Sequence, residues 1–151
     1  TIKIDDLAVD DNAIDAYREM FSIIFSDFHL FRKLYGLRHV QPETVNELLG
    51  HMQLSNKTTF VDECFTSLEL STGQRKRMAL AVALMEDKQI YLFDEWAAEQ
   101  DPEFRSYFYE HLLGELKSNG KTVVAVSHDD RYFHHADRVL KMELGGFVSD
   151  E

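Results

Sequence analysis

Two adjacent carboxylates, Asp94 and Glu95, directly follow the short apolar run "QIYLF". Such a run is typical of a strand buried on both faces of a parallel sheet, and ligands of open α/β sheets bind at the carboxyl edge. An aspartate there can hold Mg²⁺ through water, because Mg²⁺ takes few carboxylates and keeps several waters. The neighbouring glutamate can orient or deprotonate an attacking water. Two acids that merely end a strand explain the pair equally well, so the surrounding residues must decide.

A second group with chemical potential is "LSTGQ", residues 70–74. Gly73 permits close backbone approach to a phosphate, while Ser71 and the N–H groups of a following helix supply donors. The alternative is an ordinary Ser/Thr cap of a helix. The helix that follows has apolar residues at helical spacing, namely Met78, Ala81, Val82 and Met85. Because this helix leads into the strand that ends in Asp94 and Glu95, the pattern favours a phosphate-binding turn.

The elements that must position these residues fall into three consecutive regions. Residues 1–31 predict a short strand "IKI", a short helix from near Asn12 and the apolar strand "FSIIF". Residues of about 32–86 read as mainly helical, with one helix beginning at Pro42, because proline is tolerated in a first turn. Residues 87–151 alternate between strand and helix. The sequence therefore predicts an α/β fold whose core, 1–31 and 87–151, carries a helical subdomain at about 32–86.

The last region has the clearest order. Asp101 and Pro102 predict a helix cap and first turn, and Gly120 predicts the helix end. The helix carries an apolar stripe of Phe104, Phe108, Leu112 and Leu116. A second buried-type strand, "KTVVAV", follows, so strand, helix and strand predict a right-handed βαβ unit and a mainly parallel sheet. The final "RVLKMELGGFV" predicts a hairpin around Gly145-Gly146.

Composition limits the classes of function. The 151 residues suffice for one core, and no stretch approaches the ~18 apolar residues of a membrane helix. A formal net charge of −11 argues against nucleic acid as a partner, because proteins that bind nucleic acids normally present a basic face. The single cysteine, Cys64, excludes an internal disulfide.

Four motifs together carry a resemblance. "LSTGQ", "IYLFDE", "AAEQD" and "VSH" occur in the order and spacing of the ATP-binding cassette (ABC) ATPases, whose signature reads LSGGQ. The resemblance extends over about residues 22–148. The segments "SDFHLF", "DEWAAEQDP" and "VSHDDRYFHHADRVL" look most like the subfamily that exports cyclic peptides and siderophores. The fold implied is a P-loop NTPase.

The resemblance implies a role for each motif. Asp94 would hold Mg²⁺, Glu95 would be the catalytic glutamate, and His128 would contact the γ-phosphate of ATP. The residues implied to contact nucleotide are Ser26, Ser71, Thr72, Gly73, Gln74 and Asp101. Residues 71–74 would serve a nucleotide held by the opposite subunit, which Asp101 would also approach. Ser26 stands where the family has glutamine, and Thr72 replaces the second signature glycine.

The implied cofactors and partners follow. They are ATP with Mg²⁺, a second nucleotide-binding domain that forms a homodimer, and a transmembrane domain on the same chain. The implied place is the cytoplasmic face of the inner membrane, and the implied function is ATP hydrolysis that drives export of a peptide- or siderophore-like substrate. One alternative is a soluble ABC ATPase of DNA repair or of ribosomes. Another is a non-catalytic interaction module built on a decayed cassette.

The phosphate loop of such ATPases, G-x-x-x-x-G-K-[ST], is missing from the sequence. Gly120-Lys121-Thr122 imitates its end, but Glu115 stands where the first glycine should be. The triplet also leaves a helix and enters a strand, which reverses the required order. We therefore expect that the chain begins after the phosphate loop, and that these residues alone neither bind ATP tightly nor hydrolyse it.

Overall fold

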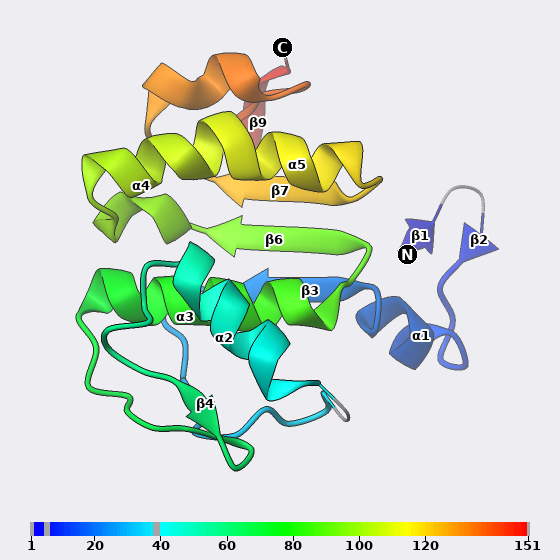
Figure 1. Cartoon of the computed structure of the whole chain (residues 1–151). Coiled ribbons are helices and arrows are strands. Elements are labelled where there is room, and N and C mark those ends of the chain that lie inside the picture. Colours follow the sequence, from blue (N-terminus) through cyan, green and yellow to red (C-terminus); the bar gives the residue numbers. More distant parts are fainter. Residues whose placement is uncertain (1, 5–6, 38–39, 151) are drawn as a thin grey trace.

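A computed structural model describes residues 2–4, 7–37 and 40–150 (Figure 1). The elements in chain order are β1 (Lys3–Ile4), β2 (Leu7–Ala8), α1 (Ile14–Arg18), β3 (Phe21–Ile24), α2 (Pro42–His51), β4 (Phe60–Val61), β5 (Cys64–Phe65), α3 (Thr72–Glu86), β6 (Ile90–Asp94), the 3₁₀ turn η1 (Trp96–Glu99), α4 (Pro102–Tyr107), the π-helical η2 (Phe108–Leu112), α5 (Leu113–Ser118), β7 (Thr122–Val126), the 3₁₀ turn η3 (Asp130–His135), β8 (Leu140–Glu143) and β9 (Gly146–Asp150). No described helix is long and apolar enough to cross a membrane.

Three parallel strands form the central sheet in the order β3-β6-β7. Their register aligns Ile23 with Leu92 and Leu92 with Val124. Strand β6 connects to β7 through the helical segment 102–118, so the predicted parallel βαβ unit and the α/β class are confirmed. All three strands run in the same direction, and their carboxyl ends therefore meet at one edge (Figure 1).

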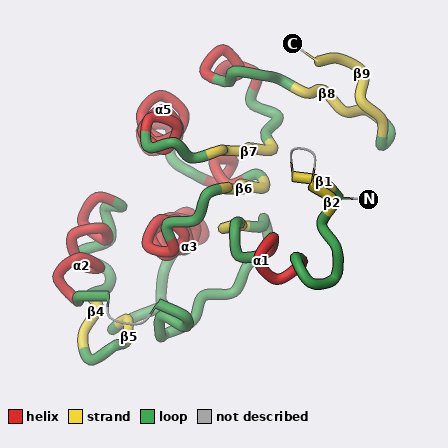
Figure 2. Tube along the Cα trace, turned by 90° about the vertical axis from the view of Figure 1, so that its right-hand side faces the viewer, coloured by secondary structure: helices red, strands yellow, loops and turns green. Residues whose placement is uncertain are grey.

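One face of the sheet is packed. Helices α2, α3 and α5 lie on that side (Figure 2). Tyr91 and Phe93 point into this layer and are each 1% exposed. The ring of Phe108 lies edge-on to Phe93 at 5.2 Å and stacks on Trp96 at 4.5 Å between ring centroids. The core therefore lies directly beneath the turn that follows Asp94.

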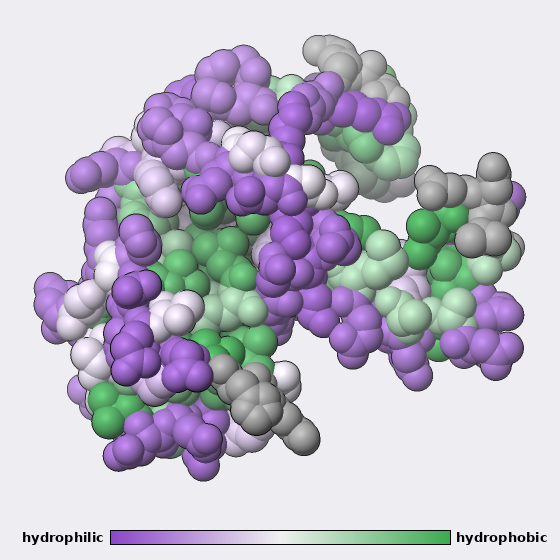
Figure 3. All heavy atoms as spheres, turned by 45° about the vertical axis from the view of Figure 1, so that its right-hand side comes forward, coloured by the Kyte–Doolittle hydropathy of each residue, from purple (hydrophilic) through white to green (hydrophobic). Residues whose placement is uncertain are grey.

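The other face is open. Ile23, Val124 and Val126 are 42%, 47% and 50% exposed, and the hairpin β8–β9 and the strands β1 and β2 lie on this side (Figure 2). Hydrophobic side chains are visible at the surface where the part that projects on the right adjoins the main body (Figure 3). Within the described residues, the expectation of burial on both faces is therefore wrong for β7, whereas β6 has one buried and one half-buried face. An apolar run shows that residues are suited to burial, but it does not supply the element that covers them.

The helical segment 102–118 is continuous through α4, η2 and α5. All four residues of its predicted stripe are buried, namely Phe104, Phe108, Leu112 and Leu116. Asp101 caps the first turn and Pro102 is its first residue, as predicted. The π-helical turn in the middle has no counterpart in the sequence analysis.

Two short hairpins differ from expectation. Strands β4 and β5 interrupt the region that reads as helical, and their turn residues Asp62 and Glu63 have φ angles of 51° and 59°. The helices described in this region are α2 and α3, and its other described residues form the hairpin, turns and loops, so the region is less helical than predicted. In the β8–β9 hairpin, the turn lies at Leu144-Gly145 rather than Gly145-Gly146, since both have positive φ and β9 already begins at Gly146.

Candidate active site

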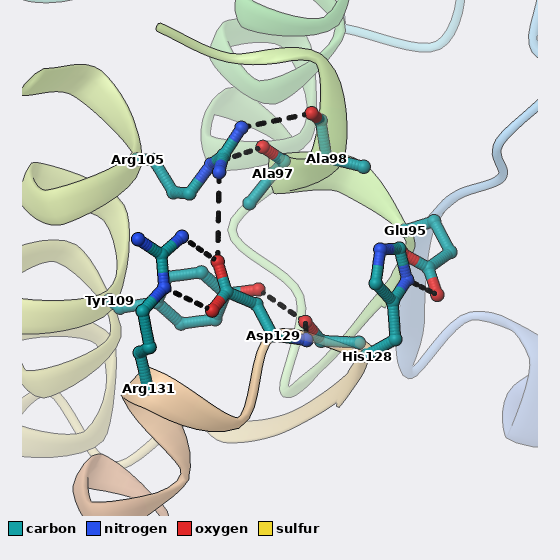
Figure 4. A pocket seen from close by; sticks show the side chains of 9 residues that line it. Glu95, Ala97, Ala98, Arg105, Tyr109, His128, Asp129 and Arg131 are labelled. Atoms are coloured by element: carbon teal, nitrogen blue, oxygen red, sulfur yellow. Dashed lines mark hydrogen bonds and ion pairs between the residues drawn. The ribbon is translucent and has the colours of Figure 1, made fainter. Parts of the chain in front are cut away.

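Glu95 and His128 meet at the carboxyl edge of the sheet. Glu95 follows β6, and His128 lies two residues beyond β7. The Oε1 atom of Glu95 lies 3.0 Å from Nδ1 of His128 (Figure 4). The side chain of His128 is 80% exposed and that of Glu95 is 32% exposed, so the pair faces solvent where a ligand could approach. Adjacent parallel strands thus bring together two residues that are 33 positions apart.

The backbone of Glu95 adopts a left-handed conformation, with φ 49° and ψ 32°. For a residue with a side chain this costs about 1–2 kcal/mol. Three hydrogen bonds hold the residue there. Its N–H donates to the carbonyl oxygen of Val126 at 3.1 Å, and its own carbonyl oxygen accepts from Nζ of Lys76 at 2.9 Å and from the N–H of Ala98 at 3.3 Å. Backbone strain that neighbours enforce is concentrated at functional sites, and Glu95 fits that description.

Asp94 and Ser26 form the second contact at this edge. Ser26 lies just beyond β3, and its hydroxyl donates to Oδ2 of Asp94 at 3.1 Å. A carboxylate with a neighbouring hydroxyl is a donor set that suits Mg²⁺, which takes one or two protein oxygens besides phosphate and water. The residues present therefore fit the metal. Although Ser26 is shorter than the glutamine of the family, it reaches the aspartate directly.

The signature turn begins α3. Ser71 is the N-cap, and its hydroxyl accepts from the N–H of Gln74 at 3.4 Å, while the Gln74 side chain accepts from the N–H of Ser71 at 3.0 Å. This is a reciprocal capping box, so the capping alternative describes the local geometry correctly. The exposed Thr72 occupies the first helical position. A phosphate role for the turn stays a prediction.

Gly73 packs against the segment that follows Glu95. A Cβ atom at this position would lie 2.9 Å from the carbonyl oxygen of Glu99. The Gln100 amide also donates to the carbonyl oxygen of Gly73 at 3.2 Å. Hydrogen bonds of the signature turn therefore go to itself and to Gln100, whereas Asp94, Glu95 and His128 form their contacts separately. The prediction that these groups serve two different nucleotides is compatible with this separation.

Asp101 has two local partners. It caps α4 by accepting from the N–H of Phe104 at 2.9 Å, and it forms an ion pair with Arg77. The Phe104 hydrogen bond and the Arg77 charge lower the pKa of Asp101, so it is ionised at neutral pH. Arg77 is buried, and it also donates to the Gln100 side chain at 2.9 Å. Contact between Asp101 and a second subunit stays a prediction.

A cavity of about 280 Å³ opens beside Glu95 and His128 (Figure 4). Its lining comprises Glu95, Ala97, Ala98, Arg105, Tyr109, Ser127, His128, Asp129 and Arg131. Arg105 donates to the carbonyl oxygens of Ala97, Ala98 and Gln100 at 3.0–3.1 Å. It also lies 3.6 Å from Asp129. Arg105 thus joins the turn after β6 to the loop after β7.

Two further side chains fix the loop that carries His128. Asp129 accepts two hydrogen bonds from Arg131 at 2.6 and 2.7 Å, and these lower the pKa of Asp129. The hydroxyl of Tyr109 donates to Ser127 at 2.9 Å, and burial raises the pKa of Tyr109, which keeps that proton in place. Sequence reasoning misses Arg105 and Tyr109. In the sequence, each of them is marked only by a polar group that lies beside the apolar stripe of the 102–118 segment.

The triplet Gly120-Lys121-Thr122 lies at the opposite edge of the sheet. It connects the end of α5 to the start of β7, as the sequence order indicates. Lys121 pairs with Asp87, which ends α3. The triplet is therefore far along the strands from Glu95 and His128, and it does not act as a phosphate loop here.

Comparison with known proteins assigns the site to a family. Residues 1–98 match the family described as ABC transporter. The ATP-binding protein SyrD of Pseudomonas syringae pv. syringae is 45% identical over an alignment of 151 positions, which covers 97% of this chain and 27% of SyrD. The probable syringafactin export ATP-binding/permease protein SyfD of Pseudomonas syringae pv. syringae is 30% identical, over 93% of this chain and 23% of SyfD.

The macrolide export ATP-binding/permease protein MacB of Agrobacterium fabrum is also 30% identical, over 96% of this chain and 23% of MacB. The chain thus spans about a quarter of the length of these relatives. Among solved structures, CbiO1 of Clostridium perfringens, part of an ABC transporter complex, superposes with a TM-score of 0.71. It is 25% identical, and the match covers 98% of this chain and 64% of CbiO1. The chain belongs to the ABC transporter family.

Proposed function

We propose that this chain supplies the signature, metal-binding and water-activating parts of an ATP-hydrolysing site in an ABC exporter. The observation that carries the proposal is the 3.0 Å contact between Glu95 and His128 at the carboxyl edge of the sheet. Asp94 and Ser26 lie at the same edge. A carboxylate that can accept a proton thus stands next to a carboxylate that suits Mg²⁺, which is the arrangement that phosphoryl transfer to water requires.

Each residue has a distinct task. Asp94, with the Ser26 hydroxyl beside it, would hold Mg²⁺, and the ion would neutralise charge on the phosphate oxygens of ATP. Glu95 orients an attacking water and accepts its proton as the oxygen bonds to phosphorus. His128 hydrogen-bonds Glu95 and presents its other ring nitrogen to the terminal phosphate. The strained backbone and the His128 contact hold the Glu95 carboxylate in one place, so little reorganisation is needed.

The signature turn serves a second nucleotide in this proposal. Ser71, Thr72 and Gly73 open a fifteen-residue helix whose N-terminal N–H groups favour an anion. Because the turn bonds to itself and to Gln100, its outward face is available to the ATP of another copy. The working unit is then a homodimer of nucleotide-binding domains in which each domain closes the nucleotide site of the other. In this dimer, Asp101 lies close to the interface.

The remaining proposals concern the complete protein. Two relatives are named as export ATP-binding/permease proteins, which supports a role in export with a transmembrane partner domain. Attachment at the cytoplasmic face of the inner membrane and a peptide- or siderophore-like cargo are further parts of the proposal. The 151 residues contain no G-x-x-x-x-G-K-[ST] sequence. Without backbone N–H groups and a lysine for the β-phosphate, these residues alone are expected not to hydrolyse ATP.

Steady-state ATP hydrolysis by the full-length protein tests the proposal. The Glu95→Gln variant is expected to lose at least about 100-fold in kcat, because a general base contributes about 10²–10⁴-fold. Binding of ATP should remain, since the amide keeps the shape of the side chain. Glu110→Gln is the matched control, because Glu110 is exposed on the 102–118 segment, away from the cavity.

Two results would argue against the assignment. Wild-type kcat in Glu95→Gln would remove Glu95 from the reaction. A full-length protein that binds ATP without hydrolysing it would instead favour a non-catalytic interaction module.

A further inference from the structure

Lys76 is a buried cation on the signature helix. The residue is 2% exposed, and Nζ donates to the carbonyl oxygen of Glu95 at 2.9 Å. A carboxylate oxygen of Glu99 lies 3.4 Å from the same nitrogen. Burying a charged group is unfavourable unless the group is paired and hydrogen-bonded, so each of the two contacts stabilises Lys76 in this position. Neither catalysis nor the signature motif assigns a role to this residue.

A second hydrogen bond crosses the same interface in the opposite direction. The indole Nε1 of Trp96 donates to the carbonyl oxygen of Lys76 at 2.9 Å, and Trp96 is 1% exposed. The side chain of Lys76 thus bonds the backbone of Glu95, while the side chain of the next residue, Trp96, bonds the backbone of Lys76. The two bonds join α3 to the Glu95-Trp96 turn, and the side chains that donate them are both buried.

The Glu95 backbone is held by hydrogen bonds from two neighbouring elements and from its own turn. Its N–H donates to Val126 of β7, and its carbonyl oxygen accepts from Nζ of Lys76 in α3 at 2.9 Å and, at a longer 3.3 Å, from the N–H of Ala98 in the same turn. The left-handed conformation, with φ 49°, is unfavourable for glutamate unless neighbours enforce it. If the bond from Lys76 is lost, only the longer bond from Ala98 within the 3₁₀ turn still holds the carbonyl oxygen, so the peptide after Glu95 can rotate toward a relaxed conformation. The carboxylate would then move away from His128.

We propose that Lys76 is a positioning residue for Glu95. Through its side chain and its carbonyl oxygen, it fixes the Glu95-Trp96 turn to the helix that begins with the signature turn. The inference rests on the proposed function, because Glu95 must be the water-activating group for its position to matter. Through Lys76, helix α3 would hold the Glu95 carboxylate of the same chain in a fixed position.

The chain contains a matched control at the other edge of the sheet. Lys121, whose side chain is 11% exposed, donates to the carbonyl oxygen of Asp87 at 3.2 Å and lies 2.7 Å from its carboxylate. Asp87 is also left-handed, with φ 47°. The same chemical arrangement therefore occurs at Asp87, before β6, and at Glu95, after β6. Only the second one adjoins the site.

The experiment compares Lys76→Met with Lys121→Met in the full-length protein. Methionine keeps most of the volume but cannot donate a hydrogen bond. Both variants are expected to lower the unfolding midpoint to a similar extent. Lys76→Met should lower kcat for ATP hydrolysis at least tenfold with KM for ATP within twofold, whereas Lys121→Met should keep kcat within twofold. Equal kcat in the two variants would overturn the proposal.

Glu99→Gln separates the ion pair from the carbonyl bond. It removes the charge partner but leaves Lys76 free to donate to Glu95, so at least a third of kcat should remain. A loss as large as that of Lys76→Met would assign the effect to the ion pair and reject the positioning of Glu95. If Lys76→Met fails to fold, Trp96→Phe removes the reciprocal bond and keeps an aromatic ring. We expect at least a threefold lower kcat at unchanged KM, and an unchanged kcat overturns the proposal.

The water-activating role of Glu95 and the positioning role of Lys76 can be rejected separately. Glu95→Gln with wild-type kcat would overturn both the proposed function and the role of Lys76. Glu95→Gln inactive with Lys76→Met at wild-type kcat overturns only the role of Lys76.

Discussion

At the scale of single residues, the site depends on groups that have no chemical role of their own. Glu95 and His128 are expected together from their places after two strands, and the structure brings them to 3.0 Å. What keeps Glu95 in its strained conformation comes from elsewhere, in particular from Lys76. Local sequence patterns do not reveal such a contact, because it joins a helix to a turn nineteen residues later.

Gly73 offers a test at this scale. A methyl group at Gly73 would lie 2.9 Å from the Glu99 carbonyl oxygen, and backbone cannot move aside cheaply. Gly73→Ala is therefore expected to lower the free energy of unfolding by about 1–3 kcal/mol, as overpacking does. Denaturant unfolding measures the change.

Gly114→Ala is the matched control for this substitution. Gly114 lies in α5, and a Cβ atom there meets nothing within 4 Å. Alanine is favoured over glycine in a helix by about 1 kcal/mol, so this variant should be at least as stable as the wild type. Equal stability of the two alanine variants would show that the signature turn tolerates a side chain.

At the scale of elements, the sequence predicts helices and strands whose apolar residues recur at regular spacing, and it misses elements that lack such a pattern. The strands β3, β6 and β7 and the helices α2 and α3 follow from apolar runs and helical spacing. The β4–β5 hairpin escapes because its turn, Asp62-Glu63, lacks the asparagine or glycine that normally marks positive φ. The signature, metal and histidine positions follow from motifs. The supporting contacts of Arg105 and Tyr109 do not, since they depend on the packing of the 102–118 segment on the loop after β7.

The loop after β7 should respond to pH through Asp129. Hydrogen bonds from Arg131 lower the pKa of Asp129, so the ionised form stabilises the folded state. This contribution is complete above the ordinary carboxyl pKa of about 3.9, and it is lost as the pH falls through the lowered pKa.

The unfolding midpoint of Asp129→Asn measures this contribution. The variant should be less stable than the wild type by a constant amount near neutral pH, and the difference should shrink to zero in acid. A difference that persists at the lowest pH would show that the aspartate acts through packing instead of charge.

At the scale of the whole molecule, the open face of the sheet is the dominant feature. Val126 and Val124 are about half exposed there, together with Ile23, and the hairpin β8–β9 adds Met142 and Phe147. Contiguous apolar surface of this kind is normally covered by another segment or by a partner. Among the described residues, no strand pairs with the outer edges of β3 and β7 in the three-stranded sheet, and such open edges favour association.

Self-association of the 151-residue chain is therefore expected at micromolar concentration. Val126→Lys should reduce it, because a charge on the open face opposes burial. Val61→Lys is the matched control: Val61 is 51% exposed, against 50% for Val126, but it lies on the β4–β5 hairpin. Sedimentation velocity distinguishes the two variants. A monomer in the wild-type chain, or an equal effect of both lysines, would contradict the expectation.

The π-helical turn at Phe108–Leu112 explains why the stripe of the 102–118 segment stays on one side. Its residues recur every four positions, while an α-helix has 3.6 residues per turn, so each step overshoots by about 40°. Three such steps would carry Leu116 about 120° around the helix from Phe104, enough to turn it away from the core. A π turn holds more residues per turn and cancels part of this drift. Phe104 and Leu116 are thereby both buried, at 2% and 6% exposed. The π-helical turn thus compensates for the angular drift and keeps the apolar stripe facing the core.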